Sequence, residues 1–161
     1  MIDWKLFYPC KSFPGLTGYS DASYASSPDD HKSFTGNIFQ LNGCIITWTF
    51  QKQKSIAVST TEAEYIALSV STCQAIWLSN GLAELGFPLV PHIYCDNQGS
   101  ICLSKDPQMH KRSKHIDVHY HFVREKVDED KVTISYIPSE ENIADIFIKL
   151  LGKIQFIYFS S

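Results

Sequence analysis

Residues 34–53 contain the feature that most constrains what this chain can fold into. Two runs rich in β-forming residues, FTGNIFQLNG and CIITWTFQKQ, meet at Asn42-Gly43. An Asn-Gly pair between two such runs is the strongest short-range signal for a β-hairpin, because both residues tolerate the positive φ angles of a tight turn. The preceding run LTGYSDASYA, from Leu16, is predicted to be a further strand that ends near Asp21. We therefore expect three antiparallel strands in succession.

The hydrophobic period changes from that of strands to that of a helix at Ser59. Ser59 and Glu62 have the spacing of a capping box, in which the two side chains satisfy free backbone N–H groups at a helix start. A long helix is predicted from there to about Leu85, where Gly86 and Pro88 end it.

The second half of the chain alternates strands and helices. PHIYCD is a short apolar run typical of a strand covered on both faces, and it ends in Asp96. We predict helices in NQGSICLSKD (stopped by Pro107) and in residues 111–130, a strand in KVTISYIP, and a last helix in SEENIADIFIKLLG capped by Ser139. Helical crossovers make the last two strands parallel to the first. The predicted fold class is therefore α/β, with a five-stranded mixed sheet (three antiparallel strands, then two parallel) flanked by helices.

Composition narrows the class of protein. A chain of 161 residues argues for one domain. The net charge of −3 excludes a strongly basic, free-standing nucleic-acid binder but permits an enzyme with a local basic patch. No apolar run approaches the roughly 20 residues of a membrane span, so we expect no membrane partner. The five cysteines form no CxxC pair and most lie in apolar stretches, which favours buried, reduced thiols and an intracellular location, either cytoplasmic (including particle-associated) or nuclear.

Four carboxylates stand out by their positions. Asp21 and Asp96 lie at the ends of predicted strands, Glu64 lies in the first turns of the long helix, and Asp145 lies in the last helix. Asp145 points away from the predicted core stripe of that helix, which consists of Ile143, Ile146, Phe147, Leu150 and Leu151. Clustered carboxylates need a counter-charge, which divalent cations supply. A metal site is therefore one interpretation, and solvated surface acids or helix caps are the other.

Five motifs carry a family resemblance. In order and spacing, GYSDASYA, VSTTEAEYIALS, IYCDNQGSI, KHIDVHYHFVREKV and NIADIFIK resemble the ribonuclease H domain of copia-type retrotransposon Pol polyproteins. The resemblance implies an RNase H-like fold over residues 16–150. It leaves residues 1–15 as a lead-in or the remnant of a preceding region, and residues 151–161 as an atypical apolar tail.

The resemblance also implies an activity and a site. Asp21, Glu64, Asp96 and Asp145 fall on the family's catalytic, metal-binding carboxylates, which would hold two Mg²⁺ ions, with Mn²⁺ as a possible substitute. The implied reaction is endonucleolytic hydrolysis of the RNA strand of an RNA–DNA hybrid, with the reverse transcriptase portion of a parent polyprotein as a possible partner. Glu62 points about 200° away from Glu64 on a helix, and it is better explained as the capping partner of Ser59.

The resemblance suggests nucleic-acid contacts as well. Thr60, Thr61, Asn97 and Gln98 match positions where relatives touch the minor groove, and the basic segment from Lys105 to Lys126, with Lys111, Arg112 and Lys114, is a candidate for phosphate contact. The alternative for this segment is a solvated helix face. Zinc at His115 and His119 is disfavoured because no third ligand is convincingly spaced.

Some features depart from the family pattern. Ile148 and Leu150 stand at the usual Thr and Pro positions, and the apolar tail FIYFSS is unlike the family's polar continuation. With a methionine only fifteen residues before the first motif, these departures suggest a fragment of a decayed element. The alternative function is therefore a catalytically silent fragment that retains the fold and binds nucleic acid or protein weakly. Trp48, Trp77 and Tyr65 are predicted to be core residues.

Overall fold

The computed structural model describes residues 15–105 and 114–148, except for the side chains of residues 114–118 and 120. The strands are β1 (Leu16–Ser23), β2 (Phe34–Leu41), β3 (Cys44–Lys52), β4 (His92–Cys95) and β5 (Thr133–Tyr136). The helices are α1 (Thr60–Glu84), α2 (Gln98–Lys105), α3 (Lys114–Asp128), the short 3₁₀ helix η1 (Ser139–Glu141) and α4 (Asp145–Ile148). The predicted tail at 151–161, and the predicted lead-in apart from Gly15, lie outside the described residues.

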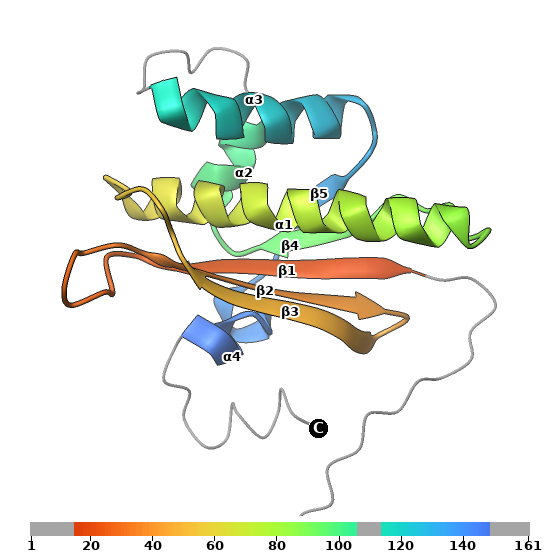
Figure 1. Ribbon diagram of the computed structural model, residues 1–161, viewed down its shortest axis with the longest axis horizontal. Coiled ribbons are helices and arrows are strands. Elements are labelled where there is room, and N and C mark those ends of the chain that lie inside the picture. The colour runs from red at the N-terminus through yellow and green to blue at the C-terminus, as the bar shows by residue number, and fades with distance from the viewer. Residues whose placement is uncertain (1–14, 106–113, 149–161) are drawn as a thin grey trace, which may run out of the picture.

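The five strands form one mixed sheet in the order β3-β2-β1-β4-β5. β1 pairs antiparallel with β2, and β2 with β3, whereas β4 is parallel to both β1 and β5. α1 and α3 lie on one side of the sheet and α4 on the other (Figure 1). The predicted fold class, with three antiparallel strands followed by two parallel ones, is confirmed.

The local signals at the hairpin and at the long helix act as predicted. Asn42 and Gly43 have φ angles of 55° and 83°, which a tight hairpin turn requires. At the start of α1, the backbone N–H of Glu62 donates to Oγ of Ser59 over 3.2 Å. The Glu62 carboxylate in turn accepts the N–H of Val58 over 3.1 Å, one residue earlier than in a strict capping box.

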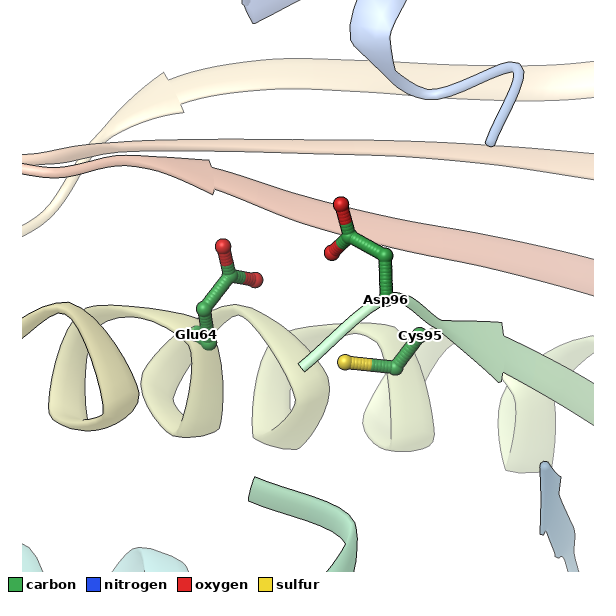
Figure 2. Close-up of side chains that lie close together, drawn as sticks. All are labelled: Glu64, Cys95 and Asp96. Atoms are coloured by element: carbon green, nitrogen blue, oxygen red, sulfur yellow. The ribbon is translucent and has the colours of Figure 1, made fainter. Parts of the chain in front are cut away.

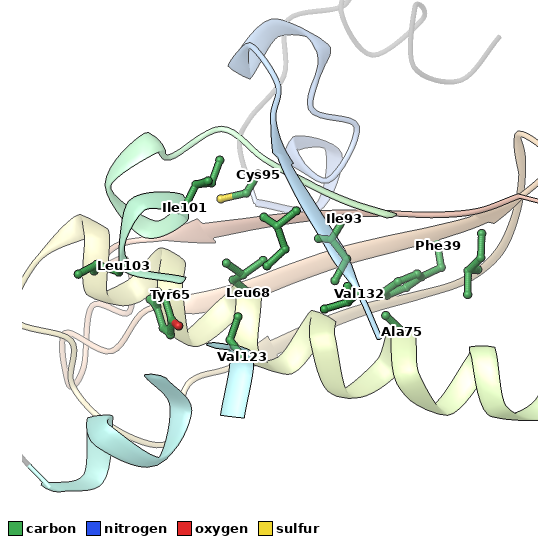
Figure 3. Close-up of a cluster of buried hydrophobic side chains, with 12 residues drawn as sticks. Phe39, Tyr65, Leu68, Ala75, Ile93, Cys95, Ile101, Leu103, Val123 and Val132 are labelled. Atoms are coloured by element: carbon green, nitrogen blue, oxygen red, sulfur yellow. The ribbon is translucent and has the colours of Figure 1, made fainter. Parts of the chain in front are cut away.

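The core fills the space between the sheet and α1. Phe39 of β2 and Ile93 of β4 meet Tyr65 and Leu68 of α1, and Val123 of α3 completes this cluster (Figure 3). Gly18 leaves room for Phe39, because a Cβ atom there would lie 2.5 Å from its ring. The prediction that Tyr65 is a core residue is confirmed.

The predicted burial of both tryptophans is wrong. Trp48 is 58% exposed and Trp77 is 69% exposed. Trp48 lies on the edge strand β3 opposite Ile38, and therefore on the face away from the one where Phe39 meets α1. Trp77 follows the fully buried Ala75 by two residues, which places it about 200° around the helix.

Other local expectations also need correction. β4 is covered fully on one face only: Ile93 and Cys95 are buried, whereas His92 and Tyr94 are half-buried and pack against each other. Of the described cysteines, Cys95 is buried, Cys44 is half-buried, and Cys73 and Cys102 are exposed. The apolar run PHIYCD therefore predicts more burial than β4 has, because one face of the strand stays partly exposed.

The last predicted helix is shorter and interrupted. Ser139 begins the separate turn η1, which Pro138 precedes without a side-chain cap, and α4 begins only at Asp145. Ile143, Ile146 and Phe147 are half-buried, and Leu150 and Leu151 lie outside the described residues. α4 packs on β2, where Gly36 leaves room for Ile148: a Cβ atom there would lie 2.6 Å from Ile148 Cδ1.

Candidate active site

Asp21 and Asp96 meet because β1 and β4 are parallel neighbours. Ser20 is paired with Cys95, so the next residue along each strand is one of the two aspartates. Asp21 is 1% exposed, and its Oδ1 accepts the N–H of Ala22 over 2.8 Å. β1 continues two residues beyond Asp21 to Ser23, whereas Asp96 directly follows β4.

Glu64 approaches the two aspartates from α1. It lies in the second turn of the helix and is 8% exposed, and its carboxylate lies beside that of Asp96 (Figure 2). Burial, followed by the negative charges of Asp21 and Asp96, raises the pKa of Glu64 well above its ordinary value. Its Oε2 atom is buried and has no hydrogen-bond partner among the described residues.

Asp145 reaches the same place from the opposite side of the sheet. It is the first residue of α4 and is 3% exposed. The fully buried Asn142 fastens this segment to β1: its Nδ2 donates to the carbonyl of Ser20 over 3.0 Å, and its Oδ1 accepts the N–H of Ala144 over 3.2 Å. The sequence analysis did not single out Asn142, although the residue lies in the NIADIF motif.

The four predicted carboxylates form two overlapping groups. One oxygen from each of Asp21, Asp96 and Asp145 lies within 4.8 Å of the others. Glu64 and Asp96, together with the sulfur of Cys95, form a second group within the same limit. Asp96 belongs to both groups, so the structure brings all four predicted site residues into one cluster.

This cluster fits divalent cations. Carboxylate oxygens are the ligands that Mg²⁺ prefers, and a buried carboxylate oxygen without a partner, as in Glu64, is stabilised by a nearby cation. The sequence analysis missed Cys95 as a member of the cluster. Its position as the last residue of the strand before Asp96 was the available signal.

Four of the residues predicted to contact nucleic acid lie at or beside the starts of α1 and α2. Thr60 and Gln98 are exposed, beside Thr61 and Asn97, which are half-buried. Ser100 joins the starts of the two helices: its Oγ donates to the carbonyl of Thr61 and its N–H donates to Asn97 Oδ1, both over 3.0 Å. Asn97 therefore also serves as a cap for α2.

The basic segment is described only in part. Lys111 and Arg112 lie outside the described residues, as do the side chains of Lys114 and His115. His119 lies within hydrogen-bonding distance of Ser69, with 2.8 Å between Nδ1 and Oγ, and in the described part of the chain it belongs to neither candidate metal group.

One further residue, Ser139, contacts the carboxylate cluster. Ser139 Oγ donates to Asp96 Oδ2, so Ser139 contacts the site and does not cap a helix as predicted.

Among residues 15–105 and 114–148, none of the helices has the length and apolar character of a membrane span.

Comparison with known proteins finds retrovirus-related Pol polyproteins of transposons among the relatives. The chain is 44% identical over 146 residues to the retrovirus-related Pol polyprotein from transposon TNT 1-94 of Nicotiana tabacum, a match that covers 90% of the chain and 11% of the relative. It is 37% identical over 147 residues to the Pol polyprotein from transposon RE2 of Arabidopsis thaliana, which covers 90% of the chain and 10% of the relative. The chain thus spans about a tenth of the curated relatives it matches. No family model matches it.

Solved structures of RNase H domains share the fold of this chain. The N-terminal RNase H domain of rv2228c from Mycobacterium tuberculosis superposes with a TM-score of 0.61 at 11% identity, covering 89% of this chain and 97% of that one. LC11-RNase H1, in a crystal structure with an RNA/DNA hybrid, superposes with a TM-score of 0.56 at 13% identity, covering 83% and 93%.

The mixed sheet, the flanking helices and the carboxylate cluster thus define an RNase H-type domain. The chain is homologous to one segment of the retrovirus-related Pol polyproteins from transposons TNT 1-94 and RE2. The predicted family resemblance is confirmed.

Proposed function

We propose that this domain is an endoribonuclease that hydrolyses the RNA strand of RNA–DNA hybrids with two Mg²⁺ ions, for which Mn²⁺ can substitute. The convergence of four carboxylates from β1, α1, the end of β4 and α4 carries this proposal. The fold shared with an RNase H1 that was crystallised with an RNA/DNA hybrid supports the choice of substrate.

In this proposal Asp21, Asp96 and Asp145 would hold one cation, and the carboxylates of Glu64 and Asp96 would hold the other. Paired divalent cations supply activation of a water and stabilisation of the leaving oxygen in phosphodiester hydrolysis. The chain itself contributes orientation: Ser139 holds the Asp96 carboxylate and Asn142 holds the segment that carries Asp145.

The residues that would contact the nucleic acid are also part of this proposal. Thr60, Thr61, Asn97 and Gln98 lie at the starts of α1 and α2, and in our proposal they contact the minor groove, where the 2′-hydroxyl distinguishes RNA from DNA. The relatives are Pol polyproteins, so we propose the reverse transcriptase portion of a parent polyprotein as the partner that presents the hybrid, in an intracellular compartment.

A cleavage assay tests the activity. The purified chain is incubated with an RNA–DNA hybrid labelled on the RNA strand, with Mg²⁺ or with a chelator, beside matched DNA and RNA duplexes. We expect Mg²⁺-dependent cleavage of the hybrid alone, lost in Asp96→Asn and kept in Asp30→Asn, since Asp30 is a half-buried aspartate outside the cluster that pairs with Lys52. The same signal from the chain and from Asp96→Asn, or no cleavage at all, would instead favour the alternative of a silent fragment.

A further inference from the structure

Cys95 places a sulfur atom inside a cluster that otherwise consists of oxygen ligands. Cys95 is fully buried at the end of β4, and its sulfur points toward the space beside Glu64 (Figure 2). Its Sγ, one oxygen of Glu64 and one of Asp96 lie within 4.8 Å of one another. Sγ accepts one hydrogen bond, from the N–H of Asn97 over 3.5 Å, and its further lone pair can bind a metal.

A second observation points to a cation in this group. Glu64 is more than nine-tenths buried, and its Oε2 atom has no hydrogen-bond partner among the described residues. A buried carboxylate oxygen in this state is costly without a positive charge nearby. A cation held by Glu64 and Asp96 in this group would also lie beside the sulfur, because the three ligand atoms lie within 4.8 Å of one another.

The donor set discriminates between metals. Mg²⁺ takes oxygen ligands and gains nothing from a thiol, whereas Zn²⁺ and Cd²⁺ bind thiolates strongly. Zinc–sulfur and zinc–oxygen bonds of about 2.3 and 2.0–2.2 Å place tetrahedral ligand atoms roughly 3.5 Å apart. The three atoms lie within 4.8 Å of one another, so metal binding would have to draw them closer together. Three protein ligands leave one position open, as in catalytic zinc sites.

We propose that Glu64, Cys95 and Asp96 form a thiophilic metal site that binds Zn²⁺ or Cd²⁺ in competition with Mg²⁺. Binding forms a metal–sulfur bond and releases the thiol proton to solvent. Because Glu64 and Asp96 are shared, a bound zinc ion displaces the cation needed for hydrolysis and inhibits the domain. The inhibition rests on the proposed function, whereas the metal binding does not.

Cadmium is the direct probe of binding, since a cadmium–thiolate bond has a charge-transfer band in the ultraviolet. The full chain, without Mg²⁺, is titrated with Cd²⁺. We expect the band at one equivalent in the native chain and in a variant with serine at positions 10, 44, 73 and 102, which keeps Cys95 as its sole cysteine. We expect its loss in Cys95→Ala. A band that persists in Cys95→Ala, or that disappears in the four-serine variant, would overturn the proposal.

Competition with a chelator gives the affinity of the same site for Zn²⁺. Removing Cys95 should lower this affinity by at least ~10-fold, the lower end of what loss of even an outer-shell partner costs. Thermal unfolding checks that Cys95→Ala is folded, and equal zinc affinities of folded native chain and variant would refute the assignment.

The cleavage assay then tests the consequence. Adding Zn²⁺ at constant Mg²⁺ should inhibit the native chain, and the zinc concentration for half-inhibition should rise at least ~10-fold in Cys95→Ala, each relative to its own zinc-free rate. Equal inhibition of both would overturn the inhibitory role. If the native chain binds Cd²⁺ through Cys95 but cleaves nothing, the proposed function is refuted and the proposed metal site is not.

Discussion

Ser139 Oγ donates a hydrogen bond of 2.5 Å to Oδ2 of Asp96, across 43 residues of sequence. Ser139 lies in η1, just after β5, and Asp96 follows the neighbouring strand β4. Asp96 is the carboxylate common to both candidate metal groups, so this bond orients the most shared ligand of the cluster. Such outer contacts orient metal ligands and tune their affinity.

Ser139→Ala should therefore weaken metal binding without unfolding the domain. We expect Mg²⁺ or Mn²⁺ affinity, measured by calorimetry, to fall by on the order of 10-fold. Ser79→Ala is the matched control, because Ser79 Oγ donates to the carbonyl of Leu89 over 2.6 Å near the far end of α1. Equal affinities of Ser139→Ala and Ser79→Ala would contradict an orienting role for Ser139.

Glu64 should make the metal-free protein less stable as the pH rises. Burial and the nearby Asp21 and Asp96 raise the pKa of Glu64 in the folded state, so between the unfolded pKa near 4.5 and the folded pKa the native state holds more protons than the unfolded state. The stability from this group is present below the unfolded pKa and is lost as the pH rises through the folded pKa.

Denaturant unfolding at a series of pH values, with a chelator present, measures this loss. In Glu64→Gln the corresponding decline should be absent, and Mg²⁺ should flatten it in the native chain because a cation compensates the charge. A native chain and a Glu64→Gln variant with the same pH dependence would show that Glu64 ionises as freely as in water.

Substitution of Glu62 should lower stability, whereas substitution of Glu64 should lower metal affinity. The Glu62 carboxylate accepts the N–H of Val58 before α1, so Glu62→Ala should lower the free energy of unfolding by about 1–2 kcal/mol. Its metal affinity should stay close to that of the native chain, whereas Glu64→Ala should lose most of its affinity. A loss of metal affinity in Glu62→Ala equal to that in Glu64→Ala would reverse the assignment of the two glutamates.

Asn142 should support both the packing of α4 and the position of Asp145. Asn142→Ala removes two hydrogen bonds and leaves the buried carbonyl of Ser20 without that donor, at a cost of about 1–3 kcal/mol in unfolding free energy. Mg²⁺ affinity should fall as well, because the segment before Asp145 is no longer fastened to β1.

Asn37 provides the control for Asn142. It is also fully buried, but neither polar atom of its side chain has a hydrogen-bond partner in the described part of the chain. Asn37→Ala should therefore cost less than Asn142→Ala in the same denaturant titration. The reverse order would show that the two bonds of Asn142 contribute little.

Local chemistry in the sequence was sufficient to predict the five strands, the long helix and their order, but not the break between η1 and α4. The turn at Asn42-Gly43 and the cap at Ser59 depend on neighbouring residues only, so both could be recognised without a fold. The crossover connections then implied which strands are parallel, because helical links between strands leave few other topologies. The family motifs identified the four carboxylates as site residues. From spacing alone, each could also be a solvated surface acid or a helix cap.

Only the tertiary structure decided what surrounds those carboxylates. Ser139 contacts Asp96, and Cys95 lies beside Glu64, because folding brings together segments far apart in the chain. Trp48 and Trp77 are exposed because their sides of β3 and α1 face away from the core. A hydrophobic pattern reports which side of an element is apolar but not whether another layer covers it. For the same reason, the raised pKa of Glu64 arises only when folding removes water and brings Asp21 and Asp96 beside it.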